Sequence, residues 1–183
     1  MRPIDENQLI RTAQAGNAPA FEQLLIDSYD RIYRFAYRWC GNRADAEDVT
    51  QLTCIKLAQS IGQFRFEAAF SSWLYRLVIN CAKDWHRSKQ RHQHDDLERL
   101  ASETHSDQRA ENGIYLQQIL QLLDSLAEGF KETALLVHAE GLTHAEAAII
   151  LQVKESTVSW RLHEIRKQLQ SLQQGDGSWE VSL

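Results

Sequence analysis

Apolar residues recur at helical spacing through most of this chain, and β-branched runs bounded by turn residues are few. The pattern predicts four helices in the first half, over residues 5–16, 19–40, 44–60 and 71–87. It predicts four more in the second half, over residues 113–126, 128–140, 143–151 and 156–171. Only two prolines and eight glycines interrupt these segments, so the sequence predicts an all-α fold.

The helix predicted over residues 71–87 carries an apolar stripe on one side and an unusual polar face on the other. Four polar residues recur on that face at steps of four, three and four, with two more residues beside them: Arg76, Asn80, Lys83, Arg87, Tyr75 and Ile79. A row of cations suits a phosphate backbone, and the Asn80 amide can read a base edge. Phe64 and Phe66 in the preceding loop, like Tyr75, favour stacking on unpaired bases. The alternatives are a solvated charged face and a loop anchored in the core by its two rings.

Two short helices joined by a tight turn lie in the last part of the chain. Gly141 ends the helix before them, and Thr143 with Glu146 forms a capping box at the start of the first. The second buries four residues at steps of four, three and four: Val158, Leu162, Ile165 and Leu169. Its exposed hydroxyls and bases can reach base edges and phosphates, so the pair predicts a helix-turn-helix. The alternative is an exposed terminal helix with ordinary solvated charge.

The sign of the charge reverses between the two halves of the chain. Residues 83–91 hold four bases and one acid, whereas residues 93–112 hold six acids and two bases and lose the apolar periodicity. Such a polar stretch is typical of a linker. The sequence therefore predicts two small helical domains joined by a flexible acidic linker. The domains span residues 1–87 and 113–172, the linker spans 88–112, and a tail spans 173–183.

The composition, 183 residues with a net charge of −5, is ordinary for a soluble globular protein. The negative charge argues against nucleic-acid binding driven by bulk electrostatics alone. No apolar run reaches the roughly 18–20 residues that span a bilayer. The N-terminus also lacks the apolar stretch of a signal peptide. We therefore expect a cytoplasmic protein with no direct membrane insertion.

No residue pattern in the sequence favours catalysis. The three cysteines, Cys40, Cys54 and Cys81, fall among apolar helical positions and are interpreted as small buried hydrophobic residues. The histidines considered as metal ligands are His86, His92, His94 and His105. Only two of them are close in sequence, and no second pair at metal-ligand spacing accompanies them. We expect no enzyme, no catalytic residue, no metal and no cofactor.

Two segments resemble a known protein family. The run DAEDVTQLTCIKLAQSIGQF, followed by FSSWLYRLVINCAKDWHR, looks like region 2 of bacterial RNA polymerase sigma factors. It looks most like the extracytoplasmic-function (ECF) type, which keeps only regions 2 and 4. The segment LAEGFKETALLVHAEGLTHAEAAIILQVKESTVSWRLHEIRKQL looks like region 4. Together the two segments cover most of residues 15–170.

The resemblance implies a dissociable sigma factor that binds core RNA polymerase and directs promoter-specific initiation of transcription. The polymerase contacts would be the clamp helices of the largest subunit and the flap, and the residues matching the clamp-docking motif are Asp45, Glu47, Asp48 and Gln51. Region 2 would recognise and melt the minus-ten element through Phe64, Arg65, Phe66, Tyr75, Arg76, Ile79, Asn80, Lys83 and Arg87. Region 4 would read the minus-thirty-five element through Lys154, Ser156, Thr157, Ser159, Trp160, Arg161, Arg166 and Lys167.

The resemblance also implies an anti-sigma factor, often membrane-anchored, which would hold the protein at the inner membrane. Exposed apolar residues such as Ile79 and Trp160 are the expected contacts with it. Leu52 stands where the family usually has an acid, and Trp160 adds an indole to the recognition helix, which favours contacts with thymine methyls. These departures leave open a sigma-like decoy that sequesters an anti-sigma factor without directing transcription. A stand-alone repressor is a third possibility, although no dimer seam supports it.

Overall fold

The computed structural model describes residues 5–96 and 110–175, and helices are the only regular elements among them. The chain divides into two compact units, Met1–Gln117 and Gln118–Leu183, and the division falls inside the fifth helix. The predicted all-α class with two helical regions is confirmed. Residues 97–109 of the predicted linker and most of the predicted tail lie outside the described residues.

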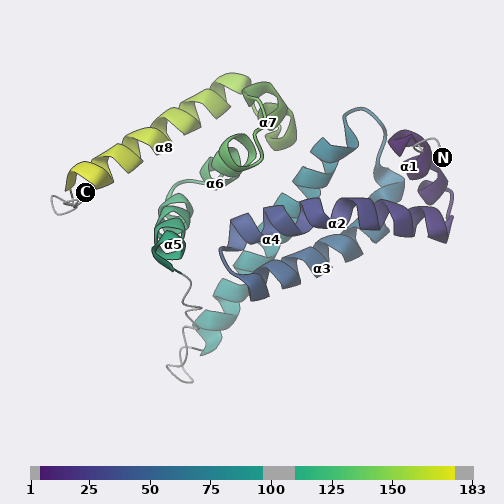
Figure 1. Ribbon diagram of the computed structural model, residues 1–183, viewed down its shortest axis with the longest axis horizontal. Coiled ribbons are helices and arrows are strands. Elements are labelled where there is room, and N and C mark those ends of the chain that lie inside the picture. Colours follow the sequence, from purple (N-terminus) through teal and green to yellow (C-terminus); the bar gives the residue numbers. More distant parts are fainter. Residues whose placement is uncertain (1–4, 97–109, 176–183) are drawn as a thin grey trace. The chain divides into compact units, whose positions relative to one another are not determined.

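The first unit is built on a hairpin of two long helices that a third helix crosses (Figure 1). Its elements are α1 (Glu6–Gln14), α2 (Ala18–Cys40), α3 (Arg43–Ser60), the 3-10 turn η1 (Ile61–Gln63) and α4 (Phe70–Asp96). α1 packs on α2, and α4 packs on both α2 and α3. The core residues that are most completely buried include Ile10, Leu24, Ile32, Phe35, Val49, Leu57, Leu74 and Val78.

The turn between α2 and α3 follows directly from two residues of the sequence. Gly41 ends α2 in the left-handed conformation, with φ of 73°, which glycine adopts without steric cost. Asn42 then caps α3, because its side-chain oxygen accepts a hydrogen bond from the backbone N–H of Asp45. The two helices are therefore antiparallel, and the start of α3 lies next to the end of α2.

α4 is longer than the sequence predicts. The apolar stripe ends near residue 87, whereas the helix continues to Asp96, into the segment assigned to the linker. Polar contacts hold this extension. Lys89 pairs with Asp45 of α3 and lies over the ring of Trp85, and the Gln90 amide lies 2.9 Å from a ring nitrogen of His86. The spacing of apolar residues cannot predict a stretch of helix that is stabilised by pairs of polar side chains.

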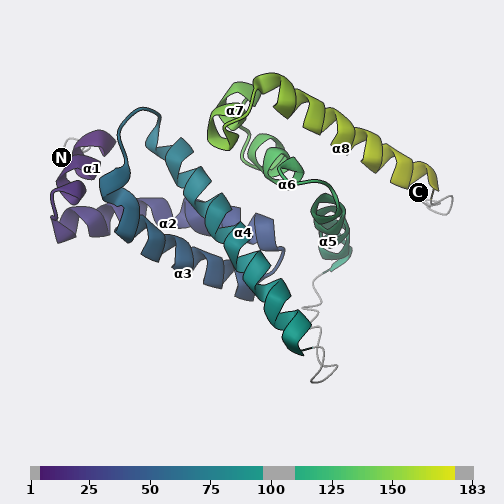
Figure 2. The same ribbon diagram turned by 180° about the vertical axis from the view of Figure 1, so that it is seen from behind.

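The second unit contains the remaining helices (Figure 2). These are the part of α5 (Ala110–Ser125) that follows Gln117, then α6 (Phe130–Ala134), the π-helical turn η2 (Leu135–Ala139), α7 (His144–Leu151) and α8 (Glu155–Gly175). α8 packs against α6 and α7. The buried residues of this unit include Leu120, Leu123, Phe130, Leu136, Ile150, Val158, Leu162 and Ile165.

The single helix predicted over residues 128–140 is two elements. Gly129 has a left-handed backbone, with φ of 92°, so α6 starts only at Phe130. The backbone then widens into η2, where the N–H of Glu140 donates to the carbonyl oxygen of Leu135 at 2.9 Å. Gly141 follows in the left-handed conformation and closes the segment, as expected.

Candidate functional site

The polar side of α4 carries four of the residues predicted to contact the minus-ten element, which we call the α4 ridge: Arg76, Asn80, Lys83 and Arg87. Asn80 and Arg87 are exposed, and Arg76 and Lys83 are half-buried. Arg87 Nη1 lies 3.5 Å from Asp84 Oδ1, an exposed pair that water and salt weaken. The α4 ridge thus places an exposed amide among cations, as reading a base beside a phosphate backbone requires.

Two residues expected beside the α4 ridge are buried instead. Tyr75 is 8% exposed and Ile79 is 3% exposed. The Tyr75 ring centroid lies 5.5 Å from that of Phe35 on α2. Because α4 packs on α2 and α3 together, its buried face is wider than its apolar stripe and includes this flank. The prediction that Ile79 is exposed is wrong, and both residues belong to the core.

The loop over residues 64–69 is anchored from inside by Phe64. This residue is buried, and its ring centroid lies 4.8 Å from that of Phe66 and 5.5 Å from that of Phe70. Phe64 therefore anchors the loop in the core, which is the alternative that the sequence left open. Arg65 is exposed and Phe66 is half-buried, so these two predicted residues reach the surface of the loop.

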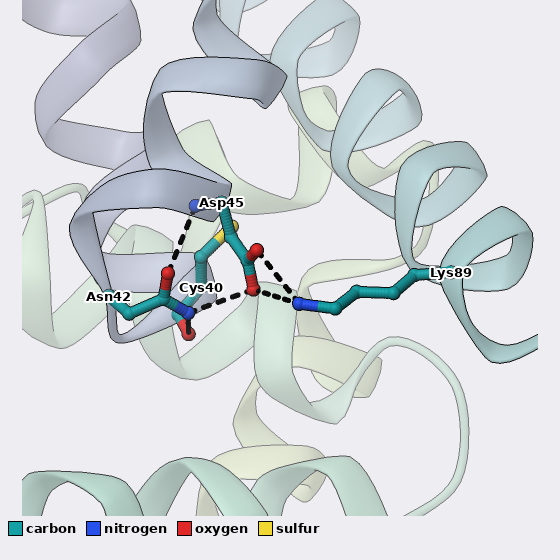
Figure 3. Close-up of polar contacts among 4 residues, drawn as sticks. All are labelled: Cys40, Asn42, Asp45 and Lys89. Carbon is teal, nitrogen blue, oxygen red and sulfur yellow. Dashed lines mark hydrogen bonds and ion pairs between the residues drawn. The ribbon is translucent and has the colours of Figure 1, made fainter. Parts of the chain in front are cut away.

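Asp45, predicted to dock on the polymerase, is engaged inside the first unit (Figure 3). Its carboxylate oxygens lie 2.7 and 2.8 Å from Nζ of Lys89 on α4, and Asn42 Nδ2 donates to Oδ2 at 2.8 Å. Asn42 Nδ2 also lies 3.3 Å from the carbonyl oxygen of Cys40. The Asp45 side chain is 17% exposed. Asp45 therefore ties the start of α3 to the distal part of α4, with little of its carboxylate left for a partner.

The other predicted docking residues, Glu47, Asp48 and Gln51, are exposed on α3. Glu47 Oε1 accepts a hydrogen bond from Arg43 Nε at 2.7 Å. This bond, followed by the charge of Glu47, raises the pKa of the Arg43 guanidinium above its usual range. Glu47 and Gln51 are one helical turn apart and so share a side of α3.

Sequence reasoning missed a row of exposed residues on α2 beside these docking residues. Five residues of the two helices line an open depression of about 340 Å³: Tyr29, Tyr33, Arg43, Glu47 and Gln51. Large apolar residues of α2 and α3 that remain exposed are Ile26, Tyr29, Tyr37, Leu52 and Ile55. The signal was present, since Ile26, Tyr29, Tyr33 and Tyr37 follow one another at steps of three, four and four. This second stripe lies beside the core stripe of the same helix, which includes Leu24, Ile32 and Phe35, so spacing alone does not separate the two. We call the surface formed by the depression and these exposed residues the α2–α3 face.

α7 and α8 form the predicted helix-turn-helix. Thr143 Oγ1 accepts from the N–H of Glu146 at 3.2 Å, and Glu146 Oε2 accepts from the N–H of Thr143 at 2.8 Å, which confirms the capping box. Gln152 makes the turn with a left-handed backbone, and α8 begins at Glu155. The predicted contacts that are exposed on this element are Lys154, Ser156, Ser159, Trp160, Arg166 and Lys167, whereas Thr157 is half-buried.

Two of these contacts are held by neighbouring helices. Trp160 is 55% exposed, and its ring stands edge-on to that of Phe130 on α6, with centroids 5.4 Å apart. Ser159 Oγ lies 3.0 Å from Nδ1 of His144 on α7. The contacts with Phe130 and His144 therefore orient these two side chains, and part of each side chain remains exposed to solvent.

Arg161, also predicted to contact the minus-thirty-five element, makes contacts within the second unit. Its Nη1 lies 3.3 Å from the carbonyl oxygen of Gly129 and 3.4 Å from Oγ1 of Thr133, and the side chain is half-buried. Its guanidinium therefore joins α8 to α6. A sequence pattern cannot distinguish this arginine from an exposed one, because Gly129 and Thr133 are distant in sequence.

The described residues offer no metal-binding group of three or more His, Cys, Asp or Glu side chains. Burial raises the pKa of the Cys54 and Cys81 thiols, and all three cysteines are half-buried. The side chains of His92, His94 and His105 lie outside the described residues. No helix in residues 5–96 and 110–175 has the length and apolar character needed to cross a bilayer.

Family comparisons match both units. Residues 25–92 match the family model for sigma-70 region 2, and residues 116–169 match that for sigma-70 region 4. The chain is 34% identical over 163 residues to the ECF RNA polymerase sigma factor SigE of Mycolicibacterium smegmatis, covering 86% of this chain and 63% of that protein. It is 28% identical over 179 residues to the ECF RNA polymerase sigma factor SigW of Bacillus subtilis, covering 89% of this chain and 96% of that protein. It thus spans less than two thirds of the first relative and nearly all of the second.

A solved structure is similar to this chain across both units. It is the sigma factor RpoE in complex with the anti-sigma factor NepR from Bartonella quintana, with 25% identity and a TM-score of 0.63. The match covers 85% of this chain and 98% of that one.

Proposed function

The chain belongs to the ECF group of sigma-70 family RNA polymerase sigma factors, and we propose that it is a dissociable promoter-specificity subunit rather than an enzyme. The observation that carries this proposal is the pairing, in one chain, of a region 2 match bearing the α4 ridge with a region 4 match bearing a helix-turn-helix. In the proposal, residues 1–87 act as region 2 and residues 113–172 as region 4. The linker 88–112 joins them, and the tail is 173–183.

The α2–α3 face is the proposed docking surface for the polymerase. Exposed Tyr29 and Tyr37 lie on the same face as Glu47 and Gln51. Such a mixture of aromatic and polar side chains matches the composition of protein interfaces, where aromatic anchors contribute much of the binding energy. Leu52 and Ile55 extend the apolar part. In this arrangement Leu52 makes an apolar contact with the polymerase. Docking is therefore compatible with a leucine at the position where the family usually has an acid. The partner surface would be the clamp helices of the largest subunit.

The α4 ridge and the outer part of the loop are the proposed minus-ten surface. Asn80 supplies paired donor and acceptor groups for a base edge, and Arg76, Lys83 and Arg87 suit the adjacent phosphates. Arg65 and Phe66 would line the same site from the loop. Phe64, Tyr75 and Ile79 support this surface from the core. Taking a base out of the stack costs about a few kcal/mol, which contacts in a pocket can offset.

The start of α8 is the proposed minus-thirty-five surface. Ser156, Ser159 and Trp160 would lie nearest the bases, with Thr157 beside them. Lys154, Arg166 and Lys167 would contact phosphates on either side. The exposed part of the indole favours thymine methyl groups, which are the apolar feature of the major groove.

We also propose control by an anti-sigma factor that covers the α2–α3 face. An exposed apolar surface of this kind on an unassembled subunit marks a binding site. The solved relative RpoE is in complex with such a factor. In this proposal the protein works in the cytoplasm, next to the polymerase, and is held at the inner membrane where that factor is membrane-anchored.

Run-off transcription tests the proposed function. Purified protein is added to sigma-free core polymerase on fragmented DNA of the source genome, and transcript ends are sequenced. Discrete starts that share two upstream motifs, about one and a half to two helical turns apart, are expected. Absence of transcripts, combined with tight binding of a purified anti-sigma factor, would instead support the decoy.

A further inference from the structure

α1 precedes residues 25–92, which match region 2, yet it contacts the loop assigned to the minus-ten element. Gln14 Nε2 donates one hydrogen bond to the carbonyl oxygen of Ile61, at 2.9 Å, and another to that of Phe64, at 2.8 Å. Both amide hydrogens of one side chain are thus used on the backbone at the entry to the loop. The bonds join residues 47 and 50 positions apart in sequence.

A second α1 residue covers the next part of the loop. The Arg11 guanidinium lies over the Phe66 ring, 4.1 Å from its centroid, at a distance typical of a cation–π contact. Phe66 has a φ of 60°, in the left-handed region that bulky residues rarely adopt. Such a conformation persists only where the surroundings fix it. Here the fixing contacts are the ring of Phe64 on one side and Arg11 on the other.

These contacts matter because no helix or strand fixes the course of the loop. Residues 64–69 form no helix or strand, and Arg65, Glu67, Ala68 and Ala69 are exposed. Phe64 anchors the loop by its ring, but a ring in a core does not set the direction of the backbone. The two Gln14 bonds do, because they fix the planes of two peptide groups, one at η1 and one at the first loop residue.

We propose that α1 is a positioning element for base selection at the minus-ten element. Gln14 and Arg11 hold the loop in the shape that receives an unpaired base, without Gln14 contacting DNA itself. The inference rests on the proposed function, since it assumes that the loop and the α4 ridge take up that base. Beyond the proposed function, we infer that accurate selection of the minus-ten base depends on α1, which lies outside the residues that match region 2.

The test uses two substitutions of the same chemical kind on the same helix. Gln14→Glu keeps the shape of the side chain and replaces Nε2, which carries both N–H donors, with a carboxylate oxygen that faces two carbonyl groups. Gln8→Glu makes the same change of charge at an exposed position of α1 and is the control. Each full-length protein is assembled with core polymerase on promoters that differ by single bases in the minus-ten element. Open complexes are counted by permanganate reactivity of unpaired thymines.

Gln14→Glu is expected to reduce the ratio of open complexes between the preferred and disfavoured bases by about three- to tenfold, as for one or two lost hydrogen bonds. Gln8→Glu should leave that ratio unchanged, and both variants should bind core polymerase as the parent does. Arg11→Met should also lower this ratio. Because Arg11 is exposed, this variant tests the inference even if Gln14→Glu does not fold.

An equal loss on every promoter, or a ratio unchanged in both Gln14→Glu and Arg11→Met, would overturn the inference and leave the proposed function standing. Failure of the parent protein to open any promoter would overturn the proposed function, and the inference with it. The two failures are therefore distinguishable within one experiment.

Discussion

The Lys89 ammonium group lies 2.7 and 2.8 Å from the two carboxylate oxygens of Asp45, 44 residues earlier in the chain. The pair joins the first turn of α3 to α4 beyond the end of its apolar stripe. The same ammonium lies 4.7 Å from the centroid of the Trp85 ring. One cation thus holds the distal half of α4 against the body of the first unit.

Lys89→Met should destabilise the first unit modestly. Because Lys89 is 41% exposed, solvent screens the pair, and the expected loss in free energy of unfolding is about 0.5–1 kcal/mol. Urea denaturation followed by circular dichroism measures it. The double variant Asp45→Lys with Lys89→Asp should recover part of the loss. No recovery would mean that the pair contributes through packing and not through charge.

If the α2–α3 face docks on the polymerase as proposed, Tyr29→Ser should weaken binding of core polymerase about tenfold or more, since tyrosines often carry a large share of the binding energy of an interface. Asp45→Asn is the matched comparison, because Asp45 is engaged with Lys89 and Asn42. Its binding affinity should stay near that of the parent. Fluorescence anisotropy of the labelled protein with core polymerase measures both. The reverse order of effects would restore Asp45 as a direct polymerase contact.

Asn80→Ala should lower open-complex formation about tenfold, the size expected for losing a paired base contact. Affinity for core polymerase should not change, because Asn80 lies on α4 and not on the α2–α3 face. Gln59→Ala, at an exposed amide of α3, is the control. Loss of polymerase binding in Asn80→Ala would show that the α4 ridge faces the polymerase.

Two arginines of α8 should respond differently to replacement by alanine. Arg161→Ala removes contacts with Gly129 and Thr133 and should cost about 1–2 kcal/mol of stability. Arg166→Ala should leave stability unchanged and reduce the slope of log affinity against log salt by about 1. Thermal melting and DNA titration at several salt concentrations separate the two. A salt-slope change for Arg161→Ala would place that side chain on the DNA.

The capping box of α7 should make the second unit sensitive to acid. The backbone hydrogen bond from Thr143, followed by that from its side chain, lowers the pKa of Glu146 in the folded protein. A lowered pKa means that the carboxylate stabilises the fold above its ordinary pKa of about 4.3. That contribution is lost as the pH falls through the folded-state pKa. Melting temperatures measured from pH 7 to pH 3 should fall less steeply for Glu146→Gln, and an identical pH dependence would contradict this.

The helices that bury one apolar stripe could be predicted closely from the sequence. The range 19–40 is observed as Ala18–Cys40, since the stripe lies within the segment and its two caps, Asn17 and Gly41, lie directly beside it. The capping box and the start of α7 could also be predicted, because Thr143 and Glu146 lie at the start of that helix. Asn80 was also identified correctly as exposed on α4.

What could not be predicted depended on neighbours distant in sequence. Burial of Tyr75 and Ile79 depends on how widely α2 and α3 cover α4, and the direction of Arg161 depends on Gly129. The extension of α4 depends on Asp45. The second stripe of α2 was visible as a pattern, but only the packing of α3 shows that this stripe is left uncovered.

The contact between Arg161 and Gly129 limits how this sequence can diverge. A Cβ at position 129 would overlap the Arg161 guanidinium, and a backbone φ of 92° disfavours any side chain there. Mutation of the glycine would therefore cost backbone strain and displace the arginine in a single step. An orthologue that has lost the glycine is expected to hold the arginine in another conformation or to have replaced it. A change at position 129 should therefore be accompanied by a change in the contact that joins α8 to α6.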